Sequence, residues 1–85
     1  NKGNEKMTSI IEKFDAAFDK AIQSPTNFFQ NGYINFSYVE ADVWLDLGKD
    51  YDRAEIKQVM ESEFNFAAAE WTNNTFNEVK EHFAA

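Results

Sequence analysis

The feature that most constrains the fold is a stripe of apolar residues near the start of the chain. Its members recur at steps of three and four positions, the spacing of one face of an α-helix: Ile10, Ile11, Phe14, Ala17, Phe18, Ala21 and Ile22. Ser9 and Glu12 match a capping box, in which each side chain bonds a backbone amide at the start of a helix. Ser24-Pro25 ends the pattern, because the residue before a proline is disfavoured in the helical region. We therefore predict a helix over residues 9–23.

The middle of the chain fits a β-hairpin. Residues 33–38 are rich in strand-forming types, and residues 42–47 alternate between apolar and polar side chains. Each segment would therefore have one apolar face. We predict two strands that are joined by a turn at residues 39–41.

A helix is the alternative for the same segment. Ser37 and Glu40 have the spacing of a capping box, and Gly48 could end the helix. The apolar residues also recur every four positions, as in a helix: Val39, Val43 and Leu47. The hairpin is preferred because the alternation over residues 42–47 is more regular.

The second half of the chain is predicted to be helical again. Over residues 53–71 the apolar residues keep a helical spacing, and Asp52 with Glu55 forms a further capping box. The polar run at residues 72–75 is predicted to break this helix, because short polar side chains compete for backbone hydrogen bonds. A short last helix would follow, with three apolar residues along one side: Phe76, Val79 and Phe83.

These elements together predict an α+β fold, with an N-terminal helix, a β-hairpin, a long helix and a short C-terminal helix packed on one face of the hairpin. Two strands alone are marginally stable, so this packing is required. A third strand near residues 64–68, or pairing with a second copy of the chain, would also fit. If the middle segment is a helix instead, the fold becomes an all-α bundle. We expect residues 1–8 to be a disordered or artificial N-terminus and residues 9–85 to be a single small acidic domain.

The residue types argue against catalysis and metal binding. The chain has no cysteine, so it has no disulfide, zinc-thiolate site or thiol nucleophile. Its only histidine, His82, lies near the end of the chain, where fraying disfavours a catalytic relay. The acids around Gly48 lack the spacing of a calcium loop. We therefore predict no enzyme, no catalytic residue, no metal site and no cofactor.

The charge distribution excludes further classes of partner. The net charge is −7, and residues 39–85 hold eleven acids but only four bases. A surface of this kind repels phosphate groups, so we expect no direct binding of nucleic acid and none of membranes. No apolar run reaches the length of about eighteen residues that marks a membrane helix. We expect a soluble protein, with a cytoplasmic location favoured.

The most suggestive functional feature is a tryptophan among acids. In the predicted hairpin Trp44 faces outward, and the alternative is that a helix or a second copy of the chain covers that face and buries Trp44 as core. If Trp44 is exposed, the partner-binding residues would be Trp44 with its acidic neighbours: Asp42, Asp46, Glu40 and Asp50. Tryptophan often anchors protein interfaces, and the acids would select a protein with a basic surface. We therefore predict a non-catalytic interaction module, such as a small regulator or inhibitor, and leave self-association open.

An acidic nucleic-acid mimic is the alternative function. Acids two residues apart on a strand, or four apart on a helix, lie about 6–7 Å apart, which is comparable to phosphate spacing. A protein of this kind would inhibit a DNA- or RNA-processing enzyme by occupying its nucleic-acid site.

Overall fold

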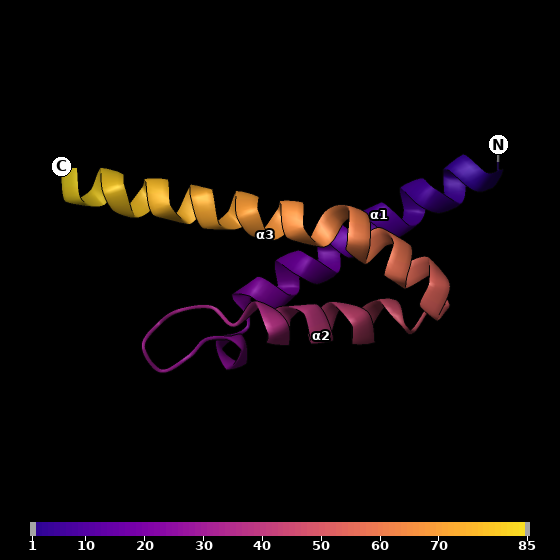
Figure 1. Cartoon of the computed structure of the whole chain (residues 1–85), viewed down its shortest axis with the longest axis horizontal. Coiled ribbons are helices and arrows are strands. Elements are labelled where there is room, and N and C mark those ends of the chain that lie inside the picture. The colour runs from indigo at the N-terminus through magenta and orange to yellow at the C-terminus, as the bar shows by residue number, and fades with distance from the viewer. Residues whose placement is uncertain (1, 85) are drawn as a thin grey trace.

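The chain folds into three α-helices (Figure 1). The computed structural model describes the backbone of residues 2–84, and the side chains of residues 9–78 and of Lys80. The elements, in chain order, are α1 (Lys2–Gln23), a short 3-10 turn η1 (Pro25–Asn27), α2 (Phe36–Leu47) and α3 (Arg53–Ala84). Residues 2–84 contain no strand, only a single antiparallel bridge between Phe28 and Ile34. The predicted α+β fold is therefore wrong, and the all-helical alternative describes the chain.

The predicted apolar stripe of α1 is confirmed. Phe14, for example, is only 1% exposed, and α1 ends at Gln23, directly before Ser24-Pro25. The helix starts earlier than expected, at Lys2, so Ser9 lies inside it and is not its cap. The Ser9 hydroxyl instead forms a hydrogen bond of 3.0 Å with the Tyr51 hydroxyl, which links α1 to the turn between α2 and α3.

The predicted hairpin is replaced by α2. Val39 and Val43 are fully buried, whereas Leu45 is 73% exposed. The apolar residues therefore follow the helical period and not the alternation of a strand. Asn35 caps the helix in place of the expected Ser37, because its side-chain oxygen accepts a hydrogen bond from the Ser37 N–H at 3.1 Å. A capped helix satisfies its own backbone groups, while two isolated strands would have needed further support.

The capping box of α3 is confirmed in both directions. The Asp52 N–H donates to a Glu55 carboxylate oxygen at 3.2 Å, and the Glu55 N–H donates to an Asp52 carboxylate oxygen at 2.9 Å. The predicted break at residues 72–75 is wrong, and the suggested strand near residues 64–68 is helical as well. The Thr72 hydroxyl donates to the Ala68 carbonyl at 2.8 Å, so it bonds within the helix and does not compete with it. The side chains of Val79, His82 and Phe83 lie outside the described residues.

The core lies where α1, α2 and the N-terminal part of α3 pack together. α1 packs mainly on α2, and ring contacts join Phe64 of α3 to Phe18 and Phe36. Among the described apolar side chains, Trp71 is the last one of α3 that packs against this core. The radius of gyration is 14.7 Å, against about 12 Å for a compact domain of this length. The difference arises because the C-terminal part of α3 and the N-terminal part of α1 project at opposite ends of the molecule (Figure 1).

Candidate protein-interaction surface

Helix α2 is apolar on two opposite faces. Its inner face packs into the core through the residues Val39, Val43 and Leu47. Its outer face carries an exposed stripe with helical spacing, here called the outer ridge: Tyr38, Ala41 and Leu45. Tyr38 is 56% exposed and Leu45 is 73% exposed. A helix that packs on a core by one face usually has polar residues on the opposite face, so an exposed apolar ridge there has the composition of an interface.

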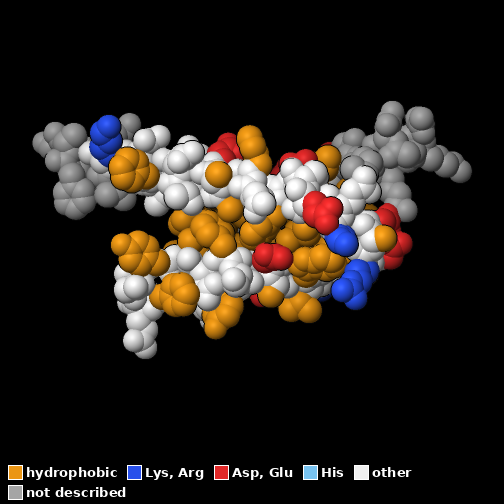
Figure 2. All heavy atoms as spheres, viewed as in Figure 1, with side chains coloured by type: hydrophobic (Ala, Val, Ile, Leu, Met, Phe, Trp, Pro, Cys, Tyr) orange, Lys and Arg blue, Asp and Glu red, His pale blue; other side chains and the backbone are white. Residues whose placement is uncertain are grey.

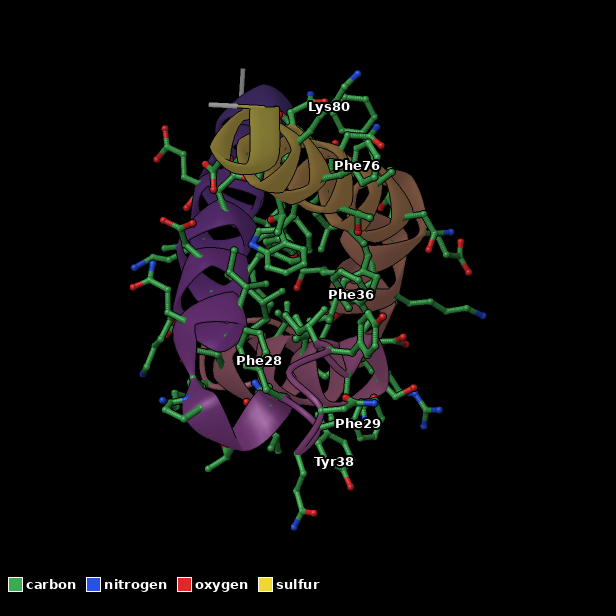
Figure 3. The ribbon with its side chains drawn as sticks, turned by 90° about the vertical axis from the view of Figure 1, so that its left-hand side faces the viewer. Phe28, Phe29, Phe36, Tyr38, Phe76 and Lys80 are labelled. Atoms are coloured by element: carbon green, nitrogen blue, oxygen red, sulfur yellow. The ribbon has the colours of Figure 1, made fainter. Side chains whose placement is uncertain are left out.

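The apolar surface continues toward the loop before α2. Figure 2 shows apolar side chains in the seam between α3 and α2 and again along the lower edge of the molecule. Phe29 lies in the loop at the same end of the molecule as Tyr38, and it is 52% exposed (Figure 3). No charged residue occurs between Lys20 and Glu40 in the sequence. The N-terminal end of the ridge therefore adjoins an uncharged aromatic loop.

The predicted acidic residues lie on both sides of the ridge and do not form a single cluster. Asp42 and Asp46 face α1 and line a hollow of about 270 Å³ together with Leu45. Glu40 lies on the other side, since two residues correspond to a rotation of about 200° around a helix. Together with Trp44 and Leu45 it lines a second hollow, of about 570 Å³. Leu45 thus stands between two hollows: the first is lined by two acids and two lysines, and the second by one acid, Glu40.

Trp44 does not project outward between Asp42 and Asp46, as a strand would have required. It is half-buried and packs against the core. In a helix these three residues do not share a face, which explains the difference. Trp44 also borders a hollow between α2 and α3 that is lined by Lys57 and Glu61. Its ring is therefore both a core residue and part of the wall beside the ridge.

Asp42 has a structural partner that the sequence did not indicate. Asn27, which is only 3% exposed, donates its side-chain amide to the Ala21 carbonyl and to Asp42 Oδ2, each at 2.8 Å. Its backbone carbonyl accepts from the Asn35 N–H at 2.7 Å. One buried amide therefore connects the end of α1, the loop and the middle of α2.

The other two predicted acids are placed near the end of α2. Asp46 forms an ion pair with Lys49 at 3.2 Å, in which the lysine side chain is 70% exposed. A pair so accessible to solvent contributes little to stability. Asp50 lies in the exposed turn that follows α2, away from the outer ridge. Asp46 therefore belongs to the wall of the ridge, while Asp50 belongs to a separate surface.

The Asn27–Asp42 contact should be measurable as a coupling. We expect Asn27→Ala to lower the free energy of unfolding by about 1–3 kcal/mol, because Asp42 Oδ2 loses the amide donor and the Ala21 carbonyl keeps only the Ser24 N–H. Urea denaturation of Asn27→Ala, Asp42→Ala and the double variant should give a coupling energy of about 1 kcal/mol. Additive effects of the two substitutions would show that the hydrogen bond does not contribute to stability.

The outer ridge and Asn27 were both missed at the level of sequence. Tyr38, Ala41 and Leu45 have the helical spacing i, i+3, i+7, which becomes visible only when the segment is treated as a helix. The hairpin prediction placed Leu45 on the buried face and so removed it from consideration. The sequence pattern around Asn27 did not indicate its two hydrogen bonds, because the partners Ala21 and Asp42 lie 6 and 15 positions away.

The remaining chemical features are few. Among the described residues, no group of three or more acidic or histidine side chains is placed to hold a metal ion. Within the same residues, no helix combines the length and apolar character needed to cross a membrane. Comparisons of the chain with protein families, with curated proteins and with solved structures found no match.

Proposed function

We propose that the protein is a non-catalytic interaction module that binds another protein through the outer ridge of α2. The observation that carries the proposal is the exposure of Leu45, 73% of which is accessible on a helix whose opposite face is fully buried. The ridge offers apolar contact along its length, and the hollows on either side of Leu45 offer places for side chains of a partner.

The charge around the ridge defines the chemistry of that partner. Helix α2 contains three acids and no base. Asp42 and Asp46 share the hollow on one side of the ridge with Lys20 and Lys49, whereas Glu40 is the only described charged residue that lines the hollow on the other side. Acids at the rim of an apolar surface favour a partner that carries Lys or Arg around an apolar stripe, and they accelerate the encounter. The partner we propose is therefore a protein segment with a basic rim around an apolar stripe.

The alternative of a nucleic-acid mimic has less support. A mimic needs a continuous row of carboxylates, but Glu40 lies on the opposite side of α2 from Asp42 and Asp46. Asp46 is also paired with Lys49, and Asp42 accepts a hydrogen bond from Asn27. The apolar outer ridge has no role in a mimic, whereas it is the central feature of a protein interface.

The test uses a synthetic helical peptide of leucine and lysine in which the leucines form one face. We expect this peptide to bind the protein and Leu45→Ser to weaken the binding at least about tenfold, equivalent to about 1.4 kcal/mol. Binding should also weaken as salt is added, because the contribution of the acidic rim is screened. Fluorescence anisotropy of the labelled peptide gives both quantities.

The matched control is Phe66→Ser, because Phe66 is 69% exposed on α3 and does not belong to the ridge. It should leave peptide binding unchanged, and circular dichroism should show that both variants retain their helices. Equal loss of binding in both variants, or no loss in Leu45→Ser, would refute the ridge as the binding surface. Trp44→Ala is a less suitable test of the ridge, because it also removes a core contact.

A further inference from the structure

The loop between η1 and α2 extends beyond the N-terminal end of α2 (Figure 1) and forms a tight turn. The Gly32 N–H donates to the Phe29 carbonyl at 2.9 Å, and the Phe29 N–H donates to the Tyr33 carbonyl at 2.7 Å. Gly32 has a φ of +89°, so it lies in the left-handed region that favours glycine. A three-residue loop that ends in such a glycine is a common hairpin connection. Asn31 directly precedes this glycine and is exposed to solvent.

We propose that Asn31 is a site of spontaneous covalent modification, at which the side-chain amide is lost through attack by the backbone nitrogen of Gly32. The Gly32 nitrogen forms a bond to Asn31 Cγ, the Cγ–Nδ2 bond breaks, and ammonia leaves with the proton of the backbone amide. Water then opens the resulting five-membered succinimide at either of its two carbonyl groups. The products are aspartate and isoaspartate, each with a carboxylate that is charged at neutral pH. The proposal does not depend on the outer ridge.

The residue that follows Asn31 favours this reaction. Glycine has no side chain that would hinder the approach of its nitrogen to the Asn31 side chain. Of the nine asparagines in the chain, Asn31 is the only one that precedes a glycine, and all the others precede larger residues. Apart from its chain neighbours, no atom of the described residues lies within 4 Å of the position that a Cβ at Gly32 would take. The succinimide ring therefore has room to form on this side of the turn.

The fold disfavours the same reaction at the other asparagines outside the N-terminal part of α1. Asn27 is 3% exposed and donates its amide to two acceptors, while Asn35 caps α2 with its side-chain oxygen. The remaining ones lie within a continuous helix, in which the N–H of the following residue bonds the preceding turn: Asn65, Asn73, Asn74 and Asn77. Reaction at any of these positions requires a helix, its cap or a buried contact to open first.

The turn at Asn31 can open without loss of the core. Its backbone hydrogen bonds join exposed residues, since Phe29 is 52% and Tyr33 is 73% exposed. The Asn31 side-chain oxygen accepts from the Tyr33 N–H at 3.1 Å, and this contact is exposed as well. Loops with few buried contacts open at a small fraction of the free energy of global unfolding. The hydrogen bonds of the turn therefore slow the reaction without preventing it.

The two products would change the loop in different ways. Aspartate keeps the oxygen that accepts from the Tyr33 N–H, but it adds a charge between Lys20 and Glu40, where the sequence has none. Isoaspartate continues the chain through its side chain, which lengthens the backbone of the turn by one methylene group. The spacing that allows the Phe29 N–H to reach the Tyr33 carbonyl is then lost.

Mass spectrometry of the protein after incubation in mildly alkaline buffer tests the proposal. The reaction requires loss of the backbone amide proton, so its rate should rise with pH. Trypsin releases residues 21–49 as one peptide, because no lysine or arginine lies between Lys20 and Lys49. Tandem spectra of this peptide assign the increase of a single mass unit to one asparagine. A synthetic peptide of residues 27–35 gives the rate of the reaction in the absence of the fold.

We expect Asn31 in the folded protein to react within about tenfold of its rate in the synthetic peptide, because the turn is held only by exposed hydrogen bonds. Asn27, Asn35 and the asparagines of α3 should stay unchanged over the same period. Asn31→Gln is the matched control, since its longer side chain would have to close a six-membered ring, and the mass of residues 21–49 should stay constant. Reaction of another asparagine before Asn31, or an unchanged Asn31 once the synthetic peptide has reacted completely, would overturn the proposal.

Discussion

Replacing Phe14 by alanine is expected to lower the free energy of unfolding by about 3–5 kcal/mol, the largest effect of any single truncation considered in this chain. Phe14 is 1% exposed and stacks on Phe18 with their ring centroids 5.9 Å apart. The loss includes the transfer free energy of the ring and the cavity that remains between the helices. A domain of this length has a total stability of about 4–13 kcal/mol, so the variant should be partly unfolded. Urea denaturation followed by circular dichroism measures the change.

Phe29→Ala is the matched control for this prediction. The same ring is removed, but Phe29 is 52% exposed in the loop before α2. Only about half of its area contributes, so we expect a loss of about 1 kcal/mol. Similar losses in the two variants would mean that the core is not organised around α1 as described.

Part of the fold could be predicted because local signals and tertiary packing agree there. The stripe of α1 has a single period and ends at a proline, so sequence and structure give the same helix. At the start of α3, Asp52 and Glu55 bond each other's backbone amides within one turn. Capping hydrogen bonds of this kind involve only neighbouring residues, so they can be predicted without knowing the tertiary packing.

Other parts could not be predicted because the deciding contacts are distant in sequence. The alternation over residues 42–47 fits a strand, and only burial of Val39 and Val43 against α1 and α3 decides for a helix. Polar residues around Thr72 suggest a break, but a helix tolerates such side chains where they point to solvent or bond the preceding turn. The hairpin prediction also concealed the outer ridge, since Tyr38, Ala41 and Leu45 share a face only on a continuous helix.

Ala41→Pro is expected to lower the free energy of unfolding by about 3 kcal/mol or more. Ala41 is exposed in the middle of α2, so the substitution removes no core contact. Proline at this position removes one backbone hydrogen bond and clashes with the carbonyl of Ser37, one turn earlier. In the hairpin predicted from the sequence, residue 41 would lie in the turn, where proline is commonly tolerated. Ala41→Gly is the control for replacing the alanine itself, because glycine weakens a helix by only about 1 kcal/mol and keeps the backbone N–H. Urea denaturation measures the free energy of unfolding of both variants. A large decrease for proline with a small decrease for glycine requires a helix at this position. Little effect of either substitution would instead favour the hairpin and remove the outer ridge as a binding surface.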